Sequence, residues 1–570
     1  MQFSHFENSA VADNWTRSQL RELSTCPSNH VTKGKRFKFQ LTSASIAWVR
    51  DTFPDAEYAD TFPKPAPNGT SQRGTFNHKI KPYEHQDRLF KQTRMLEYYA
   101  FFWEMGLGKT KEALDTAAWL YHEGLIDALL VITYNGVHLN WVTKEIPEHL
   151  HENCNYKAIA WDSSRYSSGN KKFAKALDDV CQHDGLQILS VNVEAFARDK
   201  AFNYCVAFLK GRRVLCVVDE SHAVKDPKAK RTKKILKLRE HSNYRRIMTG
   251  TPVGNSPLDL YTQFAFLSPE ILSFKSYYAF QARYAIMQPL RGVTSKAGRQ
   301  VEIVVGYRDI DELKGLIEPY SSRLTKEECL DLPLKIPLRH PFVITDEQRR
   351  LYTELVEDTV TEFEGNRIST QMAITRMLRL HQITCGFIVH DDVEAGTGGS
   401  EVVGEQICKG QHPRMSALMD VLDQVHSKAI IWSTYRYSLR EIYAAVTEKY
   451  GKGCAVGYSG ATPQNDRPGI VKRFQEDPDC RFFIGQPKAG GTGITLTAAR
   501  DVIYYSNDYS LITRLQSEDR AHRIGQEHAV TYTDLEAVNT IDSNIIEALK
   551  NKVSISAQIT GDKLVEWLTD

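Results

Sequence analysis

The sequence predicts an α/β protein with two parallel-sheet lobes, each flanked by helices. Between residues 79 and 270, short apolar runs such as ALLVITY (128–134) and VLCVVD (214–219) alternate with segments of helical periodicity. The same alternation returns after residue 411, with AIIWSTY, RFFIGQ and DVIYYSN as expected strands. A chain of 570 residues also exceeds what one hydrophobic core usually serves, so several domains are expected.

Five segments are predicted along the chain. The first, a small N-terminal accessory domain with a Pro- and Gly-rich linker, covers residues 1–78. Lobes of parallel sheet are expected at 79–270 and 411–545. The inter-lobe insertion, 271–410, is mostly helical with a hairpin at 290–307, and a C-terminal helix covers 546–570.

Composition excludes several classes of protein. With 42% hydrophobic and 25% charged residues and a formal net charge of +2, the chain is an ordinary globular one, and any nucleic-acid surface must come from local clustering. Its 10 cysteines form no close pair, which argues against zinc modules and a disulfide framework. The N-terminus has no signal-peptide pattern and no apolar run reaches membrane-spanning length, so a reduced, cytoplasmic setting is expected.

The stretch FFWEMGLGKTK at 101–111 has the order of a phosphate-binding loop: strand, glycine turn, helix. Gly106 and Gly108 would let the backbone approach phosphates, Lys109 would reach the terminal phosphates, and the Thr110 hydroxyl would hold Mg²⁺. Trp103 stands where the general motif has its first glycine, so a plain strand-to-helix turn is the alternative.

A second candidate site follows the apolar run 214–218, which ends in Asp219 and Glu220. Acids at the carboxyl end of a buried parallel strand lie at the crevice where such sheets bind ligands. Asp219 would hold Mg²⁺ through water, and Glu220 would orient and deprotonate an attacking water. Capping of the next helix by the two acids is the alternative.

Together, EMGLGKT, DESH (219–222), TGTPVGNSPLDLY (249–261) and SEDRAHRIGQ (517–526) resemble the motor of Swi/Snf-type ATPases of helicase superfamily two, over about residues 79–545. The resemblance implies two RecA-like lobes that bind ATP and Mg²⁺ between them and track along duplex or branched DNA without sequence preference. Gln86 would read the adenine, and Arg520 and Arg523 would be paired arginine fingers acting when the lobes close. The positions implied in coupling or DNA contact are Thr251, Gly491, Thr492 and Gln516.

Three positions depart from the family pattern: Trp103 before EMGLGKT, Ser221 within DESH, and Thr495 where asparagine is usual. None of these changes removes a group with a catalytic role. They affect the fit of the adenine pocket and the grip on DNA rather than hydrolysis.

The densest basic tract, 225–239, follows the acids and includes Lys225, Lys228 and Arg231. These side chains are candidates for contact with backbone phosphates, which carry no sequence information. A solvated helix face and a nuclear import signal in KAKRTKK are the alternatives.

We therefore expect a DNA-dependent ATPase that moves along duplex DNA, in a compact bacterial or viral motor. A strand-separating helicase is the first alternative; the 290–307 hairpin, the only candidate wedge, has a small, basic tip. A nucleotide switch would not need the last motif, and an inactive DNA-binding scaffold would need neither Lys109 nor Glu220.

Overall fold

The computed structural model describes most of the chain after residue 75 and five short strands before it. The described residues are 2–6, 9–13, 30–33, 36–40, 57–58, 76–161, 171–294, 300–364, 370–389, 404–407, 412–463, 465–489 and 493–560. The chain divides into two compact units, the first made of Met1–Pro252, Asp259–Tyr277 and Gly315–Leu324 and the second of Val253–Leu258, Tyr278–Lys314 and Thr325–Asp570. Each unit has its own parallel sheet, which confirms the predicted fold class.

The first unit is built on a seven-stranded sheet in which every neighbouring pair of strands is parallel. In sheet order the strands are β14 (Ser321–Leu324), β6 (Tyr98–Trp103), β11 (Tyr244–Met248), β10 (Val214–Asp219), β7 (Ala128–Thr133), β9 (Leu186–Asn192) and β8 (Tyr156–Ala160). Strands β6, β7 and β10 are buried along their whole length, which explains their continuous apolar sequences.

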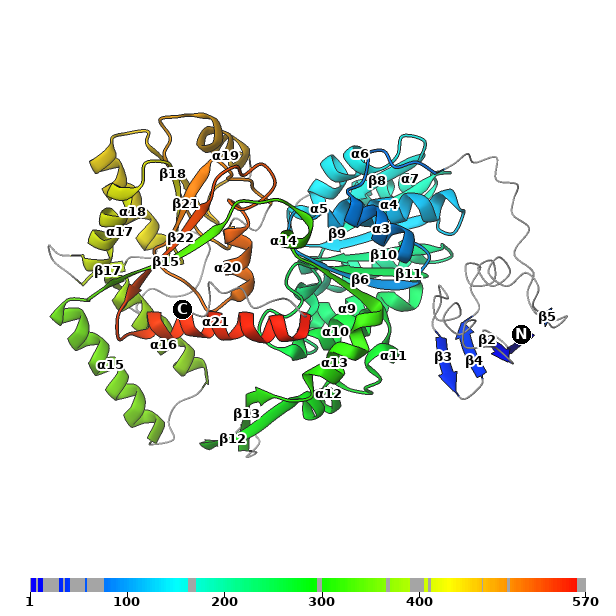
Figure 1. Ribbon diagram of the computed structural model, residues 1–570, viewed down its shortest axis with the longest axis horizontal. Helices are drawn as coiled ribbons and strands as arrows, with labels where there is room; N and C mark the ends of the chain where they lie inside the picture. The colour runs from blue at the N-terminus through cyan, green and yellow to red at the C-terminus, as the bar shows by residue number, and fades with distance from the viewer. Residues whose placement is uncertain are drawn as a thin grey trace. The chain divides into compact units, whose positions relative to one another are not determined.

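Helices flank this sheet (Figure 1). They are α3 (Glu84–Thr93), α4 (Lys109–His122), α5 (Val137–Asn140), α6 (Ile146–His149), α7 (Lys171–Cys181), α8 (Asp199–Leu209), α9 (Lys230–Leu238), α10 (Leu260–Leu267) and α11 (Pro269–Leu272). On β11 the buried Arg246 donates to the carbonyl oxygens of Thr93 and Leu96 at 2.9 and 2.8 Å. Because a cation is favourable at a helix C-terminus, Arg246 anchors the end of α3.

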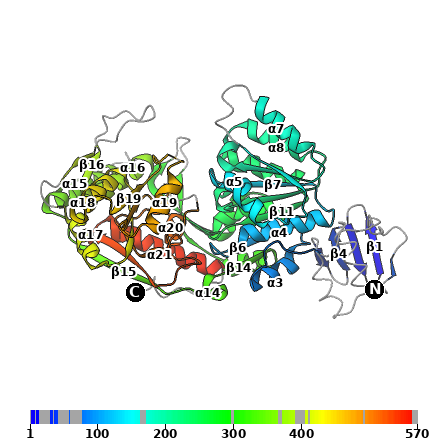
Figure 2. The same ribbon diagram turned by 90° about the horizontal axis from the view of Figure 1, so that it is seen from above.

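The second unit is built on a six-stranded parallel sheet. In sheet order the strands are β15 (Lys335–Phe342), β22 (Val530–Ala537), β21 (Ala499–Tyr504), β18 (Lys428–Trp432), β20 (Phe482–Gly485) and β19 (Ala455–Tyr458). Its helices are α14 (Lys326–Cys329), α15 (Asp346–Glu364), α16 (Thr370–Thr384), α17 (Pro413–Gln424), α18 (Arg436–Tyr450), α19 (Arg467–Glu476), α20 (Leu511–Glu518) and α21 (Ile541–Thr560). Helices α17 and α18 pack on one face through Leu418 and Ile442, and α19 packs on the other through Phe474 (Figure 2).

Strands β14 and β15 come from the segment 271–410 that the sequence predicts to be mainly helical. β14 has four residues, three of them only partly buried, so it lacks the apolar run of an inner strand. β15 lies at the edge of its sheet and contains Pro337 and Pro341, which an edge strand tolerates. Neither strand has the pattern on which the sequence prediction relied.

The predicted hairpin, 290–307, falls within a longer antiparallel pair of strands. β12 (Ala285–Thr294) pairs antiparallel with β13 (Gln300–Tyr307), between α12 (Tyr277–Tyr284) and α13 (Ile310–Ile317). Its tip, 295–299, lies outside the described residues. A second short antiparallel pair joins β16 (Phe387–Val389) to β17 (Gly404–Gln406).

The N-terminal strands form a separate five-stranded sheet in the order β3 (His30–Lys33), β4 (Arg36–Gln40), β2 (Ser9–Asp13), β1 (Gln2–Phe6) and β5 (Glu57–Tyr58). All its pairs are antiparallel except β1 with β5. Among the helices of the described segments, none combines the length and apolarity that a bilayer crossing requires.

A buried arginine ties the elements of the second unit together. Arg414, 1% exposed, forms an ion pair with Asp542 and donates to the Thr384 carbonyl at 3.1 Å and to the Leu535 carbonyl at 3.4 Å. Asp542 also accepts from the Ala537 backbone N–H at 3.1 Å. The pair therefore joins α16, α17, β22 and α21.

Arg414→Met should lower the free energy of unfolding by about 3–5 kcal/mol, because Asp542 would stay buried without its counter-charge. Arg350→Met is the matched control: Arg350 pairs with Glu354 at 2.8 Å, but the two side chains are 61% and 54% exposed. Its effect should stay within about 0.5 kcal/mol. Urea titrations followed by circular dichroism measure both, and an equal loss in the two variants would contradict the anchoring role of Arg414.

Candidate active site

The parallel register of three strands brings the predicted motifs of the first unit to one edge of its sheet. Asp219 on β10 pairs with Met248 on β11, and Met248 pairs with Phe101 on β6. The glycine turn, the segment TGTP at 249–252 and the acids therefore all leave the sheet at its carboxyl edge, where such sheets bind ligands.

The glycine turn has the backbone of a phosphate cradle. Gly106 and Gly108 have φ values of +85° and +81°, a region that favours glycine, and α4 begins at Lys109 directly after them. The buried Lys109 ammonium donates to the carbonyl oxygens of Trp103 and Glu104 at 2.8 and 3.1 Å. Lys109 thus lies folded over the turn, beside the N-terminal end of α4 that carries Thr110.

Helix α3 is fastened to this turn by its first residues. The amide nitrogen of Gln86 donates to the Leu107 carbonyl at 3.0 Å, and the amide oxygen accepts from the Tyr83 backbone N–H at 3.0 Å. The ring of His85 also contacts the Leu107 carbonyl, at 3.1 Å. Gln86 is 2% exposed, so in this structure its amide supports the turn.

The unusual Trp103 is explained by its surroundings. Its side chain is fully buried at the end of β6, and its indole N–H donates to the Ser322 hydroxyl on β14 at 2.8 Å. The bulky side chain therefore fills the contact between β6 and the added edge strand. Tertiary packing, not phosphate geometry, accounts for this residue.

Asp219 is buried, 8% exposed, at the end of β10. It accepts from the Trp141 indole N–H at 3.1 Å and from the Thr133 hydroxyl at 3.3 Å. Burial, followed by the neighbouring charge of Glu220, raises the pKa of Asp219, while the hydrogen bond from Trp141 and the charge of Lys109 oppose that rise. A nearby cation would keep this carboxyl ionised.

Glu220 has a left-handed backbone, φ 51°, which is uncommon for a residue other than glycine. Its carboxylate accepts from the Thr249 hydroxyl at 3.2 Å and lies 3.3 Å from His222 Nδ1. Burial alone would raise the pKa of Glu220, but the hydrogen bond and charge of His222, the charge of Lys109 and the bond from Thr249 together lower it. Glu220 is thus held ionised, with its side chain 20% exposed.

Thr249 and Ser221 are site residues that sequence reasoning did not assign. The Thr249 hydroxyl contacts His222 Nδ1 at 2.9 Å and accepts from the Thr251 backbone N–H at 3.1 Å, so it links the acids to the TGTP segment. The Ser221 hydroxyl donates to Gln263 on α10 at 2.6 Å, and Gln263 donates to the Pro252 carbonyl at 2.8 Å. Two series of buried hydrogen bonds thereby connect the TGTP segment to the region of the acids.

Arg323 on β14 was also missed, because nothing in the sequence places β14 beside β6. Its guanidinium donates to the carbonyls of Phe102 and Gly250 at 2.7 and 3.2 Å and lies 3.4 Å from the Glu104 carboxylate. It therefore bridges the phosphate turn and the TGTP segment.

The basic tract lies at the surface of the first unit. α9 buries Thr232, Ile235 and Leu238 and exposes Lys230, Lys233 and Lys237, as an amphipathic surface helix does, whereas Lys234 is 17% exposed and pairs with Asp199 at 2.9 Å. Lys228 is exposed and Arg231 partly buried, whereas Lys225 forms an ion pair with Asp259 at 3.3 Å. The geometry accommodates both phosphate contact and a solvated face.

In the second unit, Arg514 organises the helix that leads to the last motif. It donates to Glu518 at 2.7 Å and to Asn507 at 2.9 Å, pairs with Asp534, and packs 3.5 Å from the centre of the Tyr504 ring. α20 carries the partly buried Gln516 and delivers residues 519–523 beyond its end.

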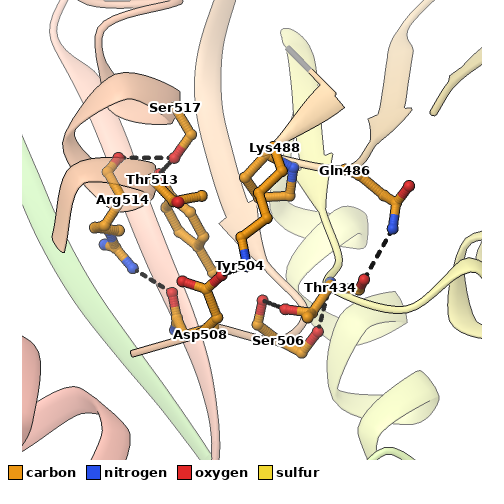
Figure 3. A pocket seen from close by; sticks show the side chains of 11 residues that line it. Thr434, Gln486, Lys488, Tyr504, Ser506, Asp508, Thr513, Arg514 and Ser517 are labelled. Carbon is orange, nitrogen blue, oxygen red and sulfur yellow. Dashed lines mark hydrogen bonds and ion pairs between the residues drawn. The ribbon is translucent and has the colours of Figure 1, made fainter. Parts of the chain in front are cut away.

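A pocket opens beside α20, with Thr434, Lys488, Ser506 and Thr513 among its lining residues (Figure 3). Lys488 forms an ion pair with Asp508 at 2.7 Å. Hydroxyls and a lysine thus line this pocket, and the lysine, Lys488, belongs to the segment 487–499. Gly491 and Thr492 of that segment lie outside the described residues.

The two arginines of the last motif are both present in the second unit, but with different surroundings. Arg520 is 7% exposed and its carbonyl accepts from the Leu496 backbone N–H at 2.9 Å, whereas Arg523 is partly exposed. Thr495, the third departure from the family pattern, is also partly buried.

The residues at this edge of the first unit's sheet fit a nucleoside triphosphate and a magnesium ion. Glycines with positive φ, a lysine and the start of a helix of 14 residues form the cradle, and an oxygen donor set of Thr110 and Asp219 suits a hard cation. In the part of the chain that the structure describes, no cluster of three or more His, Cys, Asp or Glu side chains could hold a metal ion.

Gly108→Ala should weaken nucleotide binding more than Gly106→Ala does, because a Cβ at this position would lie 2.1 Å from the Gln86 amide nitrogen and displace that side chain, in addition to the strain at φ +81°. Gly106→Ala is the matched control: φ is +85°, but a Cβ there would meet no atom within 4 Å. It should weaken binding only by its backbone strain, about 1–2 kcal/mol or roughly tenfold. Titration with a fluorescent ATP analogue measures both, and equal losses would show that Gln86 does not constrain the turn.

Three relatives illustrate what the chain is similar to. The TATA-binding protein-associated factor MOT1 of Saccharomyces cerevisiae is 24% identical over 66% of this chain and 22% of its own length. The ATP-dependent helicase FUN30 of the same yeast is 23% identical over 81% of this chain and 45% of its own length. The DNA excision repair protein CSB of Oryza sativa is 26% identical over 78% of this chain and 38% of its own length. The chain thus spans less than half the length of these relatives.

These organisms contradict one expectation. Similar proteins also occur in Homo sapiens and Arabidopsis thaliana, so the relatives are eukaryotic and the expected cytoplasmic motor of bacterial or viral origin is wrong. Motifs shaped by phosphate chemistry recur wherever that chemistry is used, and they do not specify a host or a compartment.

Among solved structures, a Sulfolobus solfataricus SWI2/SNF2 ATPase core in complex with dsDNA is 23% identical, with 85% of this chain and 95% of that chain covered and a TM-score of 0.37. Two family models match the chain itself. The helicase conserved C-terminal domain matches residues 413–525 in the second unit. The SNF2-related domain matches residues 100–387, more than half of the chain, and the protein therefore belongs to the SNF2-related family.

Proposed function

We propose that this protein is a DNA-dependent ATPase that uses ATP and Mg²⁺ to move along duplex DNA. The observation that carries the proposal is the convergence of Lys109, Asp219 and Glu220 at one sheet edge in a member of the SNF2-related family. The names of relatives, an ATP-dependent helicase and a DNA excision repair protein, support the same class of activity. Within this proposal, residues 79–270 and 411–545 are the motor lobes.

Each group of the site has a defined task in phosphoryl transfer. Gly106 and Gly108 present backbone N–H groups to the phosphates, and Lys109 exchanges its carbonyl partners for phosphate oxygens. Glu220, ionised and fixed by Thr249, orients and deprotonates the attacking water. Asp219 and Thr110 would hold a Mg²⁺ ion, which would supply neutralisation of the phosphate charge.

The remaining site assignments follow from the same proposal. Arg520 and Arg523 donate to the transferring phosphate, and Thr251 transmits the state of the nucleotide site through its contact with Thr249. Gln516, Gly491 and Thr492 take part in coupling or DNA contact, as the family resemblance implies. Phosphates of the DNA backbone are held by the basic tract, which includes Lys225, Lys228 and Arg231, and are read without sequence preference.

The β12–β13 hairpin favours duplex tracking over strand separation. A wedge that splits base pairs needs an aromatic or bulky side chain at its tip, on which a base can stack. In the sequence 285–307, the only aromatic residue is Tyr307, at the base of the hairpin. On the arms, the exposed side chains of Ile286, Ile303 and Val305 are aliphatic.

Lys109→Ala and Glu220→Gln should each abolish DNA-stimulated hydrolysis, because they remove phosphate neutralisation and water activation respectively. They should differ in binding, since Glu220→Gln retains ATP whereas Lys109→Ala binds it poorly. ATP hydrolysis with and without duplex DNA, together with nucleotide affinity, measures this. Lys472→Met, a change at a lysine that is 72% exposed, is the control. Near wild-type turnover in either site variant would exclude this site.

Duplex tracking predicts displacement of the third strand from a DNA triplex without unwinding of a forked duplex, under the same ATP and salt. Triplex displacement reports movement along a duplex, whereas fork unwinding reports separation of its strands. Efficient unwinding with no third-strand displacement would instead identify a strand-separating helicase.

A further inference from the structure

We propose that Lys326 is a positioning residue for the last motif, and that residues 321–326 couple the phosphate turn to Arg520 and Arg523. The inference rests on the proposed function. Lys326 does not contact the reacting phosphates; it acts through the segment that carries the two arginines. No pattern in the sequence points to this lysine, which lies in a short helix nearly two hundred residues before the motif.

The contacts of Lys326 are those of a buried clamp. Its residue is 5% exposed, and its ammonium forms an ion pair with the Asp519 carboxylate and donates to the His522 carbonyl. Lysine is almost never buried without partners, because desolvation of the ammonium is unfavourable. Asp519 directly precedes Arg520, and His522 directly precedes Arg523. The clamp thus fixes the backbone on which both arginines stand.

Two further contacts fasten the same stretch of chain. The His522 ring contacts the Pro333 carbonyl at 2.7 Å, and Lys335 pairs with the buried Glu518 at 3.3 Å. Segment 326–335 therefore holds 518–522 at three points. Lys326 is the one whose partners flank Arg520 on both sides.

The residues just before Lys326 are fixed to the phosphate turn of the first unit. β14 pairs with β6 from Ser321 to Leu324, and the Leu324 carbonyl accepts from the Glu104 backbone N–H at 2.9 Å. Arg323 adds its bonds to Phe102 and Gly250. The first unit ends at Leu324 and the second resumes at Thr325.

A single residue, Thr325, thus separates a strand bonded to the phosphate turn from a lysine bonded to the arginine segment. One residue spans at most about 3.6 Å, so this connection has almost no slack. A displacement of the turn at Glu104 is therefore passed through Leu324 to Lys326 and the 519–523 backbone. We expect the connection to act on the chemical step, because misplacing a catalytic group by about 1 Å reduces a rate by about a hundredfold.

Lys326→Met should lower DNA-stimulated kcat by about tenfold to a hundredfold while KM for ATP changes by less than about threefold. Asp519→Asn removes the carboxylate partner of the same ion pair with little change in side-chain size. It should lower kcat to a similar extent as Lys326→Met. Lys472→Met in α19, whose lysine lies 3.8 Å from Glu476 and is 72% exposed, is the matched control and should leave kcat unchanged. Thermal unfolding of each variant reports whether the fold is retained.

A double-mutant cycle separates positioning from a general structural role. If Lys326 acts through the arginine segment, Lys326→Met combined with Arg523→Ala is no slower than Arg523→Ala alone in single-turnover hydrolysis. The same must hold for Asp519→Asn combined with Arg523→Ala. The proposal would be overturned if the rate losses of the two single variants multiplied in the double variant. A wild-type kcat in either Lys326→Met or Arg523→Ala would also overturn it. Absence of DNA-stimulated hydrolysis in the unaltered protein would instead overturn the proposed function.

Discussion

The parallel register of β6, β11 and β10 is the constraint on which the site depends. Because Phe101, Met248 and Asp219 are aligned across three neighbouring strands, the segments that follow them leave the sheet together. The same register brings Lys109 close enough for its charge to lower the pKa values of Asp219 and Glu220, although the lysine is about a hundred residues away from them in the sequence. A shift of one residue in β10 would turn the Asp219 side chain to the other face of the sheet.

Two of the three departures from the family pattern, Trp103 and Ser221, form side-chain hydrogen bonds with residues distant in the sequence. The Trp103 indole N–H donates a hydrogen bond to Ser322 on β14, and the Ser221 hydroxyl donates one to Gln263 on α10. A buried indole or hydroxyl without a partner costs about 1–3 kcal/mol, so each polar side chain needs its acceptor in the fold. The acceptors lie far away in the sequence, and the compensation is visible only once the chain is folded.

Two arginines show how the units are stabilised by backbone oxygens as well as by counter-charges. Arg246 donates only to carbonyls among the hydrogen bonds described for it, whereas Arg414 combines carbonyls with Asp542. Burial lowers the pKa of Arg246, since no carboxylate lies close enough to outweigh desolvation. For Arg414 the charge of Asp542 outweighs the effect of burial, and its pKa is raised. Arg414 is therefore balanced by an ion pair, whereas Arg246 is held by backbone carbonyls.

The sequence by itself determined the two parallel-sheet lobes, the glycine turn, the acids and the family, because inner strands and phosphate loops impose local patterns on nearby residues. Tertiary structure alone decided the edge strands β14 and β15, the hydroxyl of Thr249 beside Glu220, and the clamp of Lys326 on Asp519. β14 has only four residues, and both edge strands are largely exposed or partly buried, so burial imposes no apolar run on them. Pairs such as Lys326 and Asp519 are polar residues nearly two hundred positions apart, and only the folded chain brings them together.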